Sequence, residues 1–374
     1  MDFFMDRENV LNRLLEEYHK HGKIIVAYDF DNTVYDMKMS GRSYDDARTL
    51  LRELKPYAEF ICFTCNPPQK YEELYEKLDM LNIPCDKINE DSDDISFGGR
   101  KVFYNIFLDD RAGLKETYDI LNNFLEKVKQ DNLAAPLTKR CVEWVRKWYE
   151  EQSGDAEGIV IGMSGGKDSS VAAALCCEAV GKDKVHGLIM PNGEQKDIDD
   201  AKEICNHLGI SFDVINVDHI YKSVISTYFA DGRKYPDSHS LTNVPPRIRM
   251  MMLYLYGQVH KYRVCGTGNK AERTVGYFTK WGDGACDFNP LGDLWVDEVV
   301  QIGDYLGLPH HLVHKTPSDG LCGKSDEENL GFSYDSVKDF FEGNTIDNDI
   351  KEKISNRVNR NYHKLIALPS IFYK

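Results

Sequence analysis

The chain twice alternates short apolar segments with amphipathic ones, and this alternation constrains its fold more than any other feature. In the first series, apolar segments at 23–30, 59–64 and 104–109 are separated or followed by amphipathic segments at 44–54, 71–81 and 114–128. Buried strands joined by helices are typical of a parallel sheet with helices on both faces. The pattern therefore predicts an α/β fold.

A second series begins after the stretch "QDNLAAPL", in which Pro136 stands near the start of a new amphipathic segment at 137–150. Its predicted strands are 158–162, 184–190, 211–217 and 262–267, and helices are expected from Asp168, over 199–208 and over 219–229. We expect two domains, 1–132 and 133–374, each a mostly parallel sheet with helices on both faces.

Composition excludes several classes of partner. The formal net charge of -15 is spread over both parts of the chain, which disfavours general nucleic-acid binding. No apolar run is long enough to span a membrane, and "MDFFMDRENV" does not resemble a secretory signal. We expect a cytoplasmic protein with no membrane partner. The ten cysteines are scattered and are expected to be reduced.

The segment "GMSGGKDSSV" joins the strand at 158–162 to the following helix. Its glycines allow backbone N–H groups to approach oxyanions, its hydroxyls add donors, and the helix presents its positive end. A nucleoside-triphosphatase P-loop is not matched, because Ile161 stands where the first glycine belongs and Asp168 follows the lysine. A carboxylate beside a phosphate needs a cation, and we expect Mg²⁺ at Asp168.

Read as S-G-G-K-D-S, this loop resembles that of the ATP-pyrophosphatase enzymes. The stretch Val264–Leu294, with supporting segments at 243–250, 315–321 and 325–343, resembles the NAD synthetases, and the likeness extends over most of Leu137–Lys374. The resemblance implies an adenine nucleotide alpha hydrolase-like fold and ATP as co-substrate. It also implies that nicotinic acid adenine dinucleotide is amidated through an adenylate, that free ammonia is the nitrogen donor, and that the enzyme is a homodimer.

The same resemblance implies the site residues. The ATP site would comprise Gly162, Met163, Ser164, Gly165, Gly166, Lys167, Asp168, Ser169, Thr267 and Ser318. The dinucleotide site would comprise Arg247, Lys280, Asp283, Asp287, His363 and Lys364, although Arg247 could instead belong to the ATP site. Asp168 and Glu272 would hold Mg²⁺. One position departs from the family, because Val296 stands where many members have a lysine expected to contact ATP, and Lys167 is a hypothetical replacement.

The first part of the chain resembles the haloacid-dehalogenase-like phosphohydrolases in the order of its motifs. Asp29 and Asp31 follow one strand, Thr64 ends the next, Lys101 comes later, and a third strand ends at Asp109 and Asp110. The resemblance implies that Asp29 attacks phosphorus, that Asp31 serves as acid and base, and that Thr64 and Lys101 hold the phosphoryl group.

A magnesium site in this first part would use Asp29, Asp31, Asp109 and Asp110. The short intervals between the motifs leave no room for a large cap, so the phosphatase would be uncapped and its substrate is unspecified. Two alternatives remain open. The second domain could be a decayed synthetase that only binds nucleotide beside an active phosphatase, or the chain could be a tRNA-modifying enzyme with the same loop.

Overall fold

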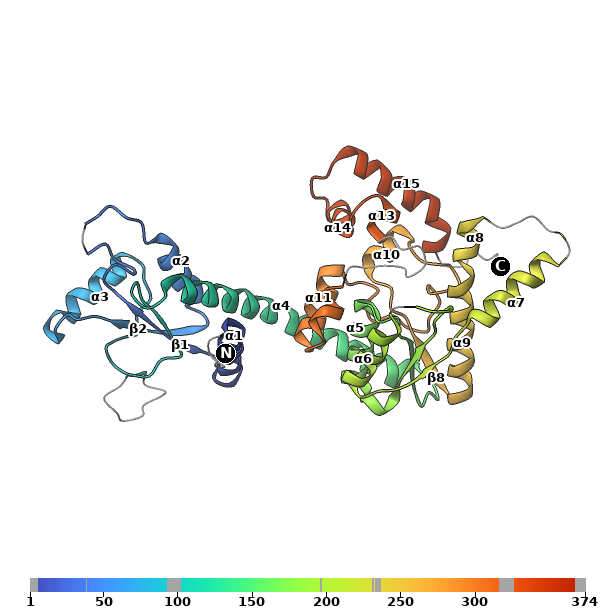
Figure 1. Ribbon diagram of the computed structural model, residues 1–374, viewed down its shortest axis with the longest axis horizontal. Helices are drawn as coiled ribbons and strands as arrows, with labels where there is room; N and C mark the ends of the chain where they lie inside the picture. Colours follow the sequence, from blue (N-terminus) through green and yellow to red (C-terminus); the bar gives the residue numbers. More distant parts are fainter. Residues whose placement is uncertain are drawn as a thin grey trace, which may run out of the picture. The chain divides into compact units, whose positions relative to one another are not determined.

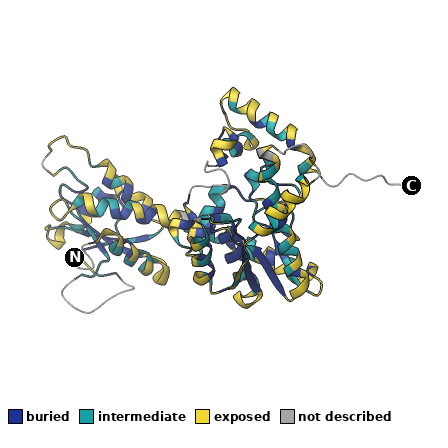
Figure 2. Cartoon of the chain, turned by 45° about the vertical axis from the view of Figure 1, so that its right-hand side comes forward, coloured by how far each residue is buried: buried dark blue, intermediate teal, exposed yellow. Residues whose placement is uncertain are grey.

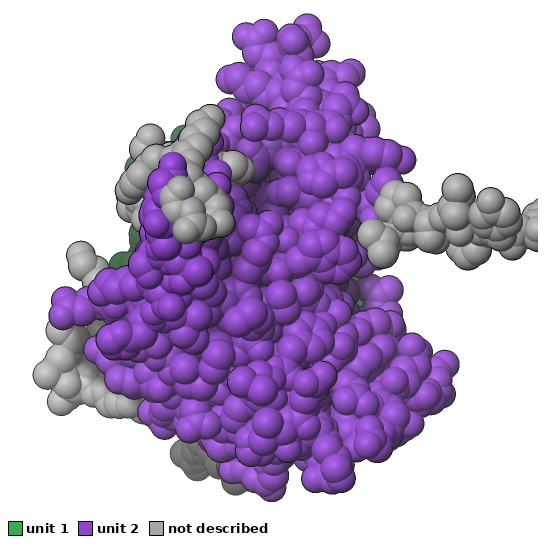
Figure 3. Space-filling model, turned by 90° about the vertical axis from the view of Figure 1, so that its right-hand side faces the viewer, with its two compact units in different colours: residues 1–132 green, residues 133–374 purple. Residues whose placement is uncertain are grey.

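The protein was analysed as a computed structural model, which describes residues 6–37, 39–92, 102–195, 197–230, 232, 237–315 and 326–366. It divides into two compact units, Met1–Asn132 and Leu133–Lys374 (Figure 1; Figure 3), here called unit 1 and unit 2. Each contains a four-stranded parallel sheet, so the predicted α/β class and the parallel sheets are confirmed. Buried residues concentrate on the strands and on the inner sides of the helices (Figure 2).

Unit 1 has the strand order β3-β2-β1-β4. Its elements are α1 (Arg7–His21), β1 (Ile24–Asp29), α2 (Asp45–Leu54), β2 (Ala58–Phe63), α3 (Tyr71–Met80), β3 (Lys87–Ile88), β4 (Ile106–Leu108) and the first part of α4 (Leu114–Gln152). The short β3 and the helix α1 were not predicted. The central strand β1 pairs with β2 and β4, so the ends of these three strands lie side by side at one edge.

The two faces of this sheet are covered differently. Val26, Tyr28 and Phe60 belong to a core that includes apolar residues from all four helices. On the opposite face, Ile25 and Ala27 pack with aromatic residues of the segment 102–107. The prediction of helices on both faces is therefore wrong for the described part of unit 1, because a loop rich in aromatic residues covers the second face.

The helix α4 corrects a second prediction. We expected separate helices on either side of the unit boundary, but α4 is continuous over 39 residues and contains Pro136. A proline removes one backbone hydrogen bond and costs about 3 kcal/mol in a helix interior. The neighbouring residues in "LAAPL" are strong helix formers, and apolar residues of α4 enter the cores of both units, including Phe124 in unit 1 and Val145 in unit 2.

Unit 2 has the strand order β7-β6-β5-β8. Its first elements are β5 (Gly158–Gly162), α5 (Lys167–Val180), β6 (Val185–Ile189), α6 (Ile198–Leu208), β7 (Ser211–Val214), α7 (Asp218–Phe229), α8 (Ser238–Thr242), α9 (Val244–His260) and β8 (Tyr262–Cys265). The remaining helices are α10 (Lys270–Val275), α11 (Val296–Tyr305), α12 (His310–Val313), α13 (Asp326–Leu330), α14 (Tyr334–Glu342) and α15 (Asn348–Leu365).

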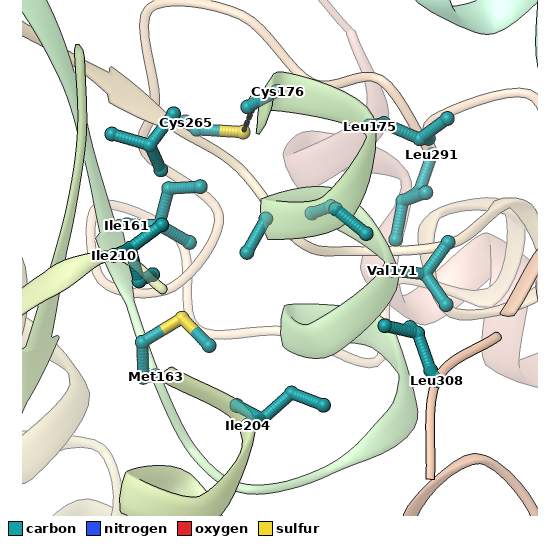
Figure 4. Close-up of a cluster of buried hydrophobic side chains, with 14 of the residues drawn as sticks. Ile161, Met163, Val171, Leu175, Cys176, Ile204, Ile210, Cys265, Leu291 and Leu308 are labelled. Atoms are coloured by element: carbon teal, nitrogen blue, oxygen red, sulfur yellow. Dashed lines mark hydrogen bonds between the residues drawn. The ribbon is translucent and has the colours of Figure 1, made fainter. Parts of the chain in front are cut away.

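Helices cover both faces of this second sheet. On one face, Ile161 and Met163 pack with residues of α5 and α6 (Figure 4), in a core where Cys176 and Cys265 bring their Sγ atoms to 3.8 Å. Residues of α11 belong to the same core. On the other face, Val160 and Leu188 pack against α9 and the start of α7. A separate cluster joins α10, α14 and α15 beside the main core. Every helix within the described residues is too short or too polar to cross a membrane.

Candidate functional site

The glycine-rich loop lies at the carboxyl end of β5, the central strand of the unit 2 sheet, and leads directly into α5. Gly166 has an extended backbone and precedes the first residue of α5, so the free N–H groups of the helix face the loop. Gly165 has a φ of +79°, and a Cβ added there would lie 2.8 Å from the carbonyl oxygen of Asp197. Any side chain at Gly165 would collide with the start of α6, so glycine is required for the loop conformation.

Two hydroxyls hold the loop in a closed arrangement. The Ser169 Oγ donates to the Gly166 carbonyl at 3.1 Å and accepts from the Ser164 N–H at 3.3 Å. The Ser164 and Ser169 Oγ atoms lie 3.0 Å apart, and the Gly166 N–H donates to the Ser164 Oγ at 3.2 Å. The loop therefore gathers glycine N–H groups and serine hydroxyls of the kind that bind phosphate oxygens.

Asn269 brings together the two carboxylates for which magnesium binding was predicted. Its Nδ2 donates to the Asp168 Oδ1 at 3.1 Å, and its backbone N–H donates to the Glu272 Oε2 at 3.1 Å. The Asn269 Oδ1 accepts from the Glu272 N–H at 3.0 Å, which completes a capping box at the start of α10. Asn269 is fully buried, so the geometry of this pair is fixed by packing as well as by hydrogen bonds.

Several charged side chains lie close together at the starts of α5 and α10. Burial raises the pKa of Glu272 well above its ordinary value, and the neighbouring Asp168 raises it further. Lys167 is also buried, with its Nζ 2.9 Å from the Asp168 Oδ2. Burial lowers the pKa of Lys167, but the carboxylates of Asp168, Glu272 and Asp326 outweigh this effect and raise it above its usual value.

Two carboxylates are a suitable donor set for Mg²⁺, which commonly binds one or two protein carboxylates and takes its other ligands from water and substrate phosphates. Within the described ranges, no three His, Cys, Asp or Glu side chains gather closely enough to surround a metal ion by themselves. The residues present therefore fit a metal that shares its ligands with a phosphate.

A cavity of about 2080 Å³ opens beside the loop. Its lining includes predicted ATP-site residues and two predicted dinucleotide-site residues: Gly162, Met163, Ser164, Gly166, Lys167, Asp168, Ser169, Thr267, Glu272, Asp283 and Lys364. The volume is large enough for more than one nucleotide-sized molecule. The predicted ATP and magnesium residues are thus gathered on one surface, except for Gly165, which packs against α6, and Ser318, which lies outside the described residues.

A second cavity of about 630 Å³ is lined by Ser240, Asn243, Arg247, Lys280, Arg357, Arg360, Asn361, His363 and Lys364. The lining of this cavity contains basic residues and no acidic ones, in a chain of net charge -15. The Lys280 ammonium donates to the His363 carbonyl, and the Arg247 Nη2 donates to the Lys280 carbonyl at 3.3 Å. Four of the predicted dinucleotide residues therefore lie together, and the cavity favours an anion.

Some of the predicted residues have structural partners instead. Asp287 lines neither cavity, and its Oδ2 accepts from the Val264 N–H at 2.8 Å, at the edge of β8. The Lys364 Nζ donates to the carbonyls of Gly276 and Phe278 at 2.9 and 2.7 Å, which ties α15 to the segment after α10. These contacts explain both residues without a ligand.

Sequence reasoning missed two polar residues that line the large cavity, Arg249 and Lys338, and a third, Asn269, that positions the paired carboxylates. Val296 begins α11 and packs in an apolar cluster, but the Lys338 Nζ reaches Asp297 at 2.7 Å from α14 and lines the cavity. Arg249 lies under the cavity floor and donates to the Met190 carbonyl at 2.8 Å. Only Asn269 had a detectable signal, the N-x-x-E capping pattern; the other two positions depend on packing between distant elements.

The candidate site of unit 1 lies where β1, β2 and β4 end. Burial raises the pKa of Asp29 to about 6, and the charges of Asp109, Asp31 and Asp110 add to the effect. The Asp31 Oδ1 is buried without a hydrogen-bond partner among the described residues. These carboxylates repel one another and include an unsatisfied oxygen, so they favour a nearby cation, although no three of these described side chains converge closely enough to surround a metal ion by themselves.

Thr64 lies at the same edge of the unit 1 sheet, immediately after β2. Its Oγ1 accepts from the Asn66 Nδ2 at 2.8 Å, and its backbone is held by the side chain of Asn89. The structure thus places Asp29, Thr64 and Asp109 at the ends of three adjacent strands. Lys101 lies outside the described residues.

Comparisons with known proteins agree with the geometry of unit 2. A glycine-rich turn that leads from the carboxyl end of a parallel strand into a helix is an arrangement that commonly binds phosphate groups. The NAD synthase family model matches residues 137–368. The NH(3)-dependent NAD(+) synthetase of Thermococcus kodakarensis is 46% identical over 185 residues, which cover 49% of this chain and 71% of that protein.

Solved structures show the same likeness. An NMN synthetase from Francisella tularensis has a TM-score of 0.59 and 34% identity, and the match covers 64% of this chain and 99% of that one. An NH3-dependent NAD synthetase from Campylobacter jejuni has a TM-score of 0.53 and 28% identity, with coverage of 64% and 99%. The chain belongs to the NAD synthase family, which confirms the resemblance found in the sequence of its second part.

Proposed function

We propose that unit 2 is an ammonia-dependent NAD synthetase that amidates nicotinic acid adenine dinucleotide. The observation that carries this proposal is the Asp168–Asn269–Glu272 arrangement beside the glycine-rich loop, in a chain of this family. The substrate carboxylate would attack the α-phosphorus of ATP, forming a C–O–P bond while the bond to pyrophosphate breaks. Ammonia would then form the C–N bond as AMP leaves and a proton is lost to solvent.

The chain's own groups would act by position and charge. The glycine N–H groups of the loop and the hydroxyls of Ser164 and Ser169 would hold the departing pyrophosphate. Asp168 and Glu272 would hold Mg²⁺, which supplies charge neutralisation at the phosphates when bound. The basic cavity around Arg247 and Lys280 would hold phosphate groups of the dinucleotide, so that the two anionic substrates are kept together.

The amide acceptor needs a direct test, because one structural relative is named an NMN synthetase. The full chain would be incubated with ATP, Mg²⁺ and ammonium, together with either the acid dinucleotide or the corresponding acid mononucleotide. We expect AMP and NAD from the dinucleotide, and loss of both in Asp168→Ala. Faster turnover of the mononucleotide would reassign the acceptor, and no AMP with either acid would refute a ligase activity.

We also propose that unit 2 forms a homodimer through α7 and α9. Met251, Leu255 and Val259 lie four residues apart on α9 and are 55%, 56% and 68% exposed. The same spacing relates Val224 and Tyr228 on α7, a helix with no buried residue. An exposed apolar stripe of this kind is suited to a self-complementary interface.

For unit 1, we propose an uncapped, magnesium-dependent phosphohydrolase, because its carboxylates and Thr64 lie at adjacent strand ends. Asp29 would attack phosphorus, Asp31 would transfer the proton, Thr64 and Lys101 would bind the phosphoryl oxygens, and Asp109 and Asp110 would complete the magnesium site. A screen of phosphate esters with Mg²⁺ tests this function. Activity that survives in Asp29→Asn would refute the assigned nucleophile.

A further inference from the structure

Lys167 lies in the glycine-rich loop, and the proposed reaction gives its positive charge no role. Its side chain is only 5% exposed, and its Nζ contacts the Asp168 Oδ2 at 2.9 Å. It also interacts electrostatically with Glu272. Asp168, one of the two carboxylates assigned to the metal, is therefore already paired with a cation that belongs to the protein.

The geometry limits how these charges can be satisfied. The Asp168 Oδ1 is bound to Asn269, so Lys167 occupies the other oxygen of the same carboxylate. A divalent cation approaching Asp168 would meet an ammonium group at contact distance, and two positive charges this close in a partly desolvated site repel each other strongly. Metal binding at Asp168 thus requires that the ammonium move to another anion.

The nucleotide phosphates are a suitable second anion. Lys167 begins α5, so it stands beside the first N–H groups of that helix, which have no partner within the helix and face the loop. We infer that Lys167 is a tethered counter-ion, which holds Asp168 in the nucleotide-free protein and passes to a phosphate oxygen when ATP enters, so that the divalent cation binds with ATP rather than before it. This inference rests on the proposed ATP and magnesium sites.

Binding of Mn²⁺ tests the inference without relying on catalysis. The full-length protein, with Asp29→Asn as a common background that weakens the proposed metal site of unit 1, would be titrated with MnCl₂ in the absence of nucleotide, and free Mn²⁺ would be followed by electron paramagnetic resonance. Removing one buried positive charge in Lys167→Gln should tighten Mn²⁺ binding by about tenfold or more. Lys167→Met is the second neutral variant if the glutamine variant fails to fold.

Two controls locate the effect. Lys222→Gln removes a lysine from an exposed Lys–Asp pair on α7, where the Nζ–Oδ2 distance is 2.6 Å, and should leave Mn²⁺ affinity unchanged. Combining Lys167→Gln with Asp168→Asn should abolish the gain. Equal affinity in the wild-type and neutral variants, or a gain that persists without Asp168, would overturn the inference.

A parallel titration with a non-hydrolysable ATP analogue separates this inference from the proposed function. After subtraction of the Mn²⁺ bound by the analogue alone, the wild-type protein should bind Mn²⁺ at least about tenfold more tightly with the analogue than without it. If the wild-type protein binds Mn²⁺ with the analogue but Lys167→Gln changes nothing without it, only the counter-ion role is wrong. If the wild-type protein binds no Mn²⁺ even with the analogue, the magnesium site itself is refuted, and the counter-ion role with it.

Discussion

The side chain of Asn269 donates a hydrogen bond to Asp168 across 101 positions of sequence, and this contact joins the start of α5 to the start of α10. Because the same asparagine also caps α10 through Glu272, one buried amide sets the separation of both carboxylates. Asn269 is therefore a positioning residue for the proposed magnesium site, although it need not touch a substrate.

Replacing Asn269 by alanine should weaken both roles. Loss of the cap and of the buried hydrogen bonds should lower the free energy of unfolding by about 2 kcal/mol. Loss of carboxylate positioning should also reduce kcat/KM for amide formation by about 10- to 100-fold. Chemical denaturation and steady-state kinetics with varied Mg²⁺ measure the two effects, and the concentration of Mg²⁺ needed for half-maximal rate should rise.

The matched control is Asp347→Ala, which removes the side-chain cap of α15 away from both cavities. It should lower stability by about 1 kcal/mol and leave the Mg²⁺ dependence unchanged. If Asn269→Ala shows the same unchanged dependence as this control, the asparagine is only a helix cap.

The raised pKa of Asp29 gives unit 1 a defined response to pH. An acid whose pKa is about 6 in the folded protein and 3.8 ordinarily holds its proton more tightly when folded. Its contribution to stability is therefore present at low pH, falls as the pH rises from about 4 to 6, and is absent above that range. The same ionisation must occur before Asp29 can act as a nucleophile, so phosphohydrolase activity should rise with pH around the folded-state pKa of about 6, and bound Mg²⁺ should shift this rise to lower pH.

Asp109→Asn should lower the pKa of Asp29, because it removes a neighbouring negative charge. Carboxyl ¹³C NMR of the full chain in a chelator-treated, metal-free sample would measure the shift directly. Asp45→Asn, which changes a carboxylate on α2, should leave the titration of Asp29 unaltered. An unchanged pKa in Asp109→Asn would show that the carboxylates do not interact.

Much of the fold of both units follows from local sequence patterns. The strand at 158–162 and the helix ends near Leu54 and Phe229 lie where the periodicity placed them, because apolar runs and breakers act over a few residues. The continuity of α4 could not be predicted in this way. The free-energy cost of Pro136 inside the helix is outweighed by the packing of α4 in two cores. Such packing cannot be recognised from the residues next to the proline in the sequence.

The site shows the same division between local and long-range information. The loop residues could be placed from their order alone, because a strand, a glycine turn and a helix are consecutive in the chain. The hydrogen-bond partners of Asp287 and Lys364 could not be predicted in this way. The Asp287 contact depends on the position of β8, and the Lys364 contact depends on the close approach of α15 to Gly276. Lys338 reaches the cavity only because α14 packs against the start of α11.

We expect Lys338, which lines the large cavity, to contribute to ATP binding in place of the lysine that Val296 replaces. Its side chain is 28% exposed and lines the cavity, and its ammonium group, which pairs with Asp297, can donate charge-assisted hydrogen bonds. Lys338→Met should raise the KM for ATP by about five- to tenfold with little change in kcat. Lys351→Met, an exposed lysine on α15, is the control. Adding Val296→Lys to Lys338→Met should restore the KM, and failure of both effects would exclude Lys338 from the ATP site.

The exposed stripe on α9 gives the last prediction. Leu255 lies at its centre, with Met251 and Val259 one turn away on either side. A glutamate at position 255 would place a charge in the proposed two-fold interface, where it would meet its own copy. Leu255→Glu should convert a dimer into a monomer in sedimentation velocity while the far-ultraviolet circular dichroism stays unchanged.

Met80→Glu, on the 78% exposed methionine of α3, should leave the sedimentation coefficient as it is. A wild-type protein that sediments as a monomer at micromolar concentration would contradict the dimer, and a Leu255→Glu variant that remains dimeric would place the interface elsewhere.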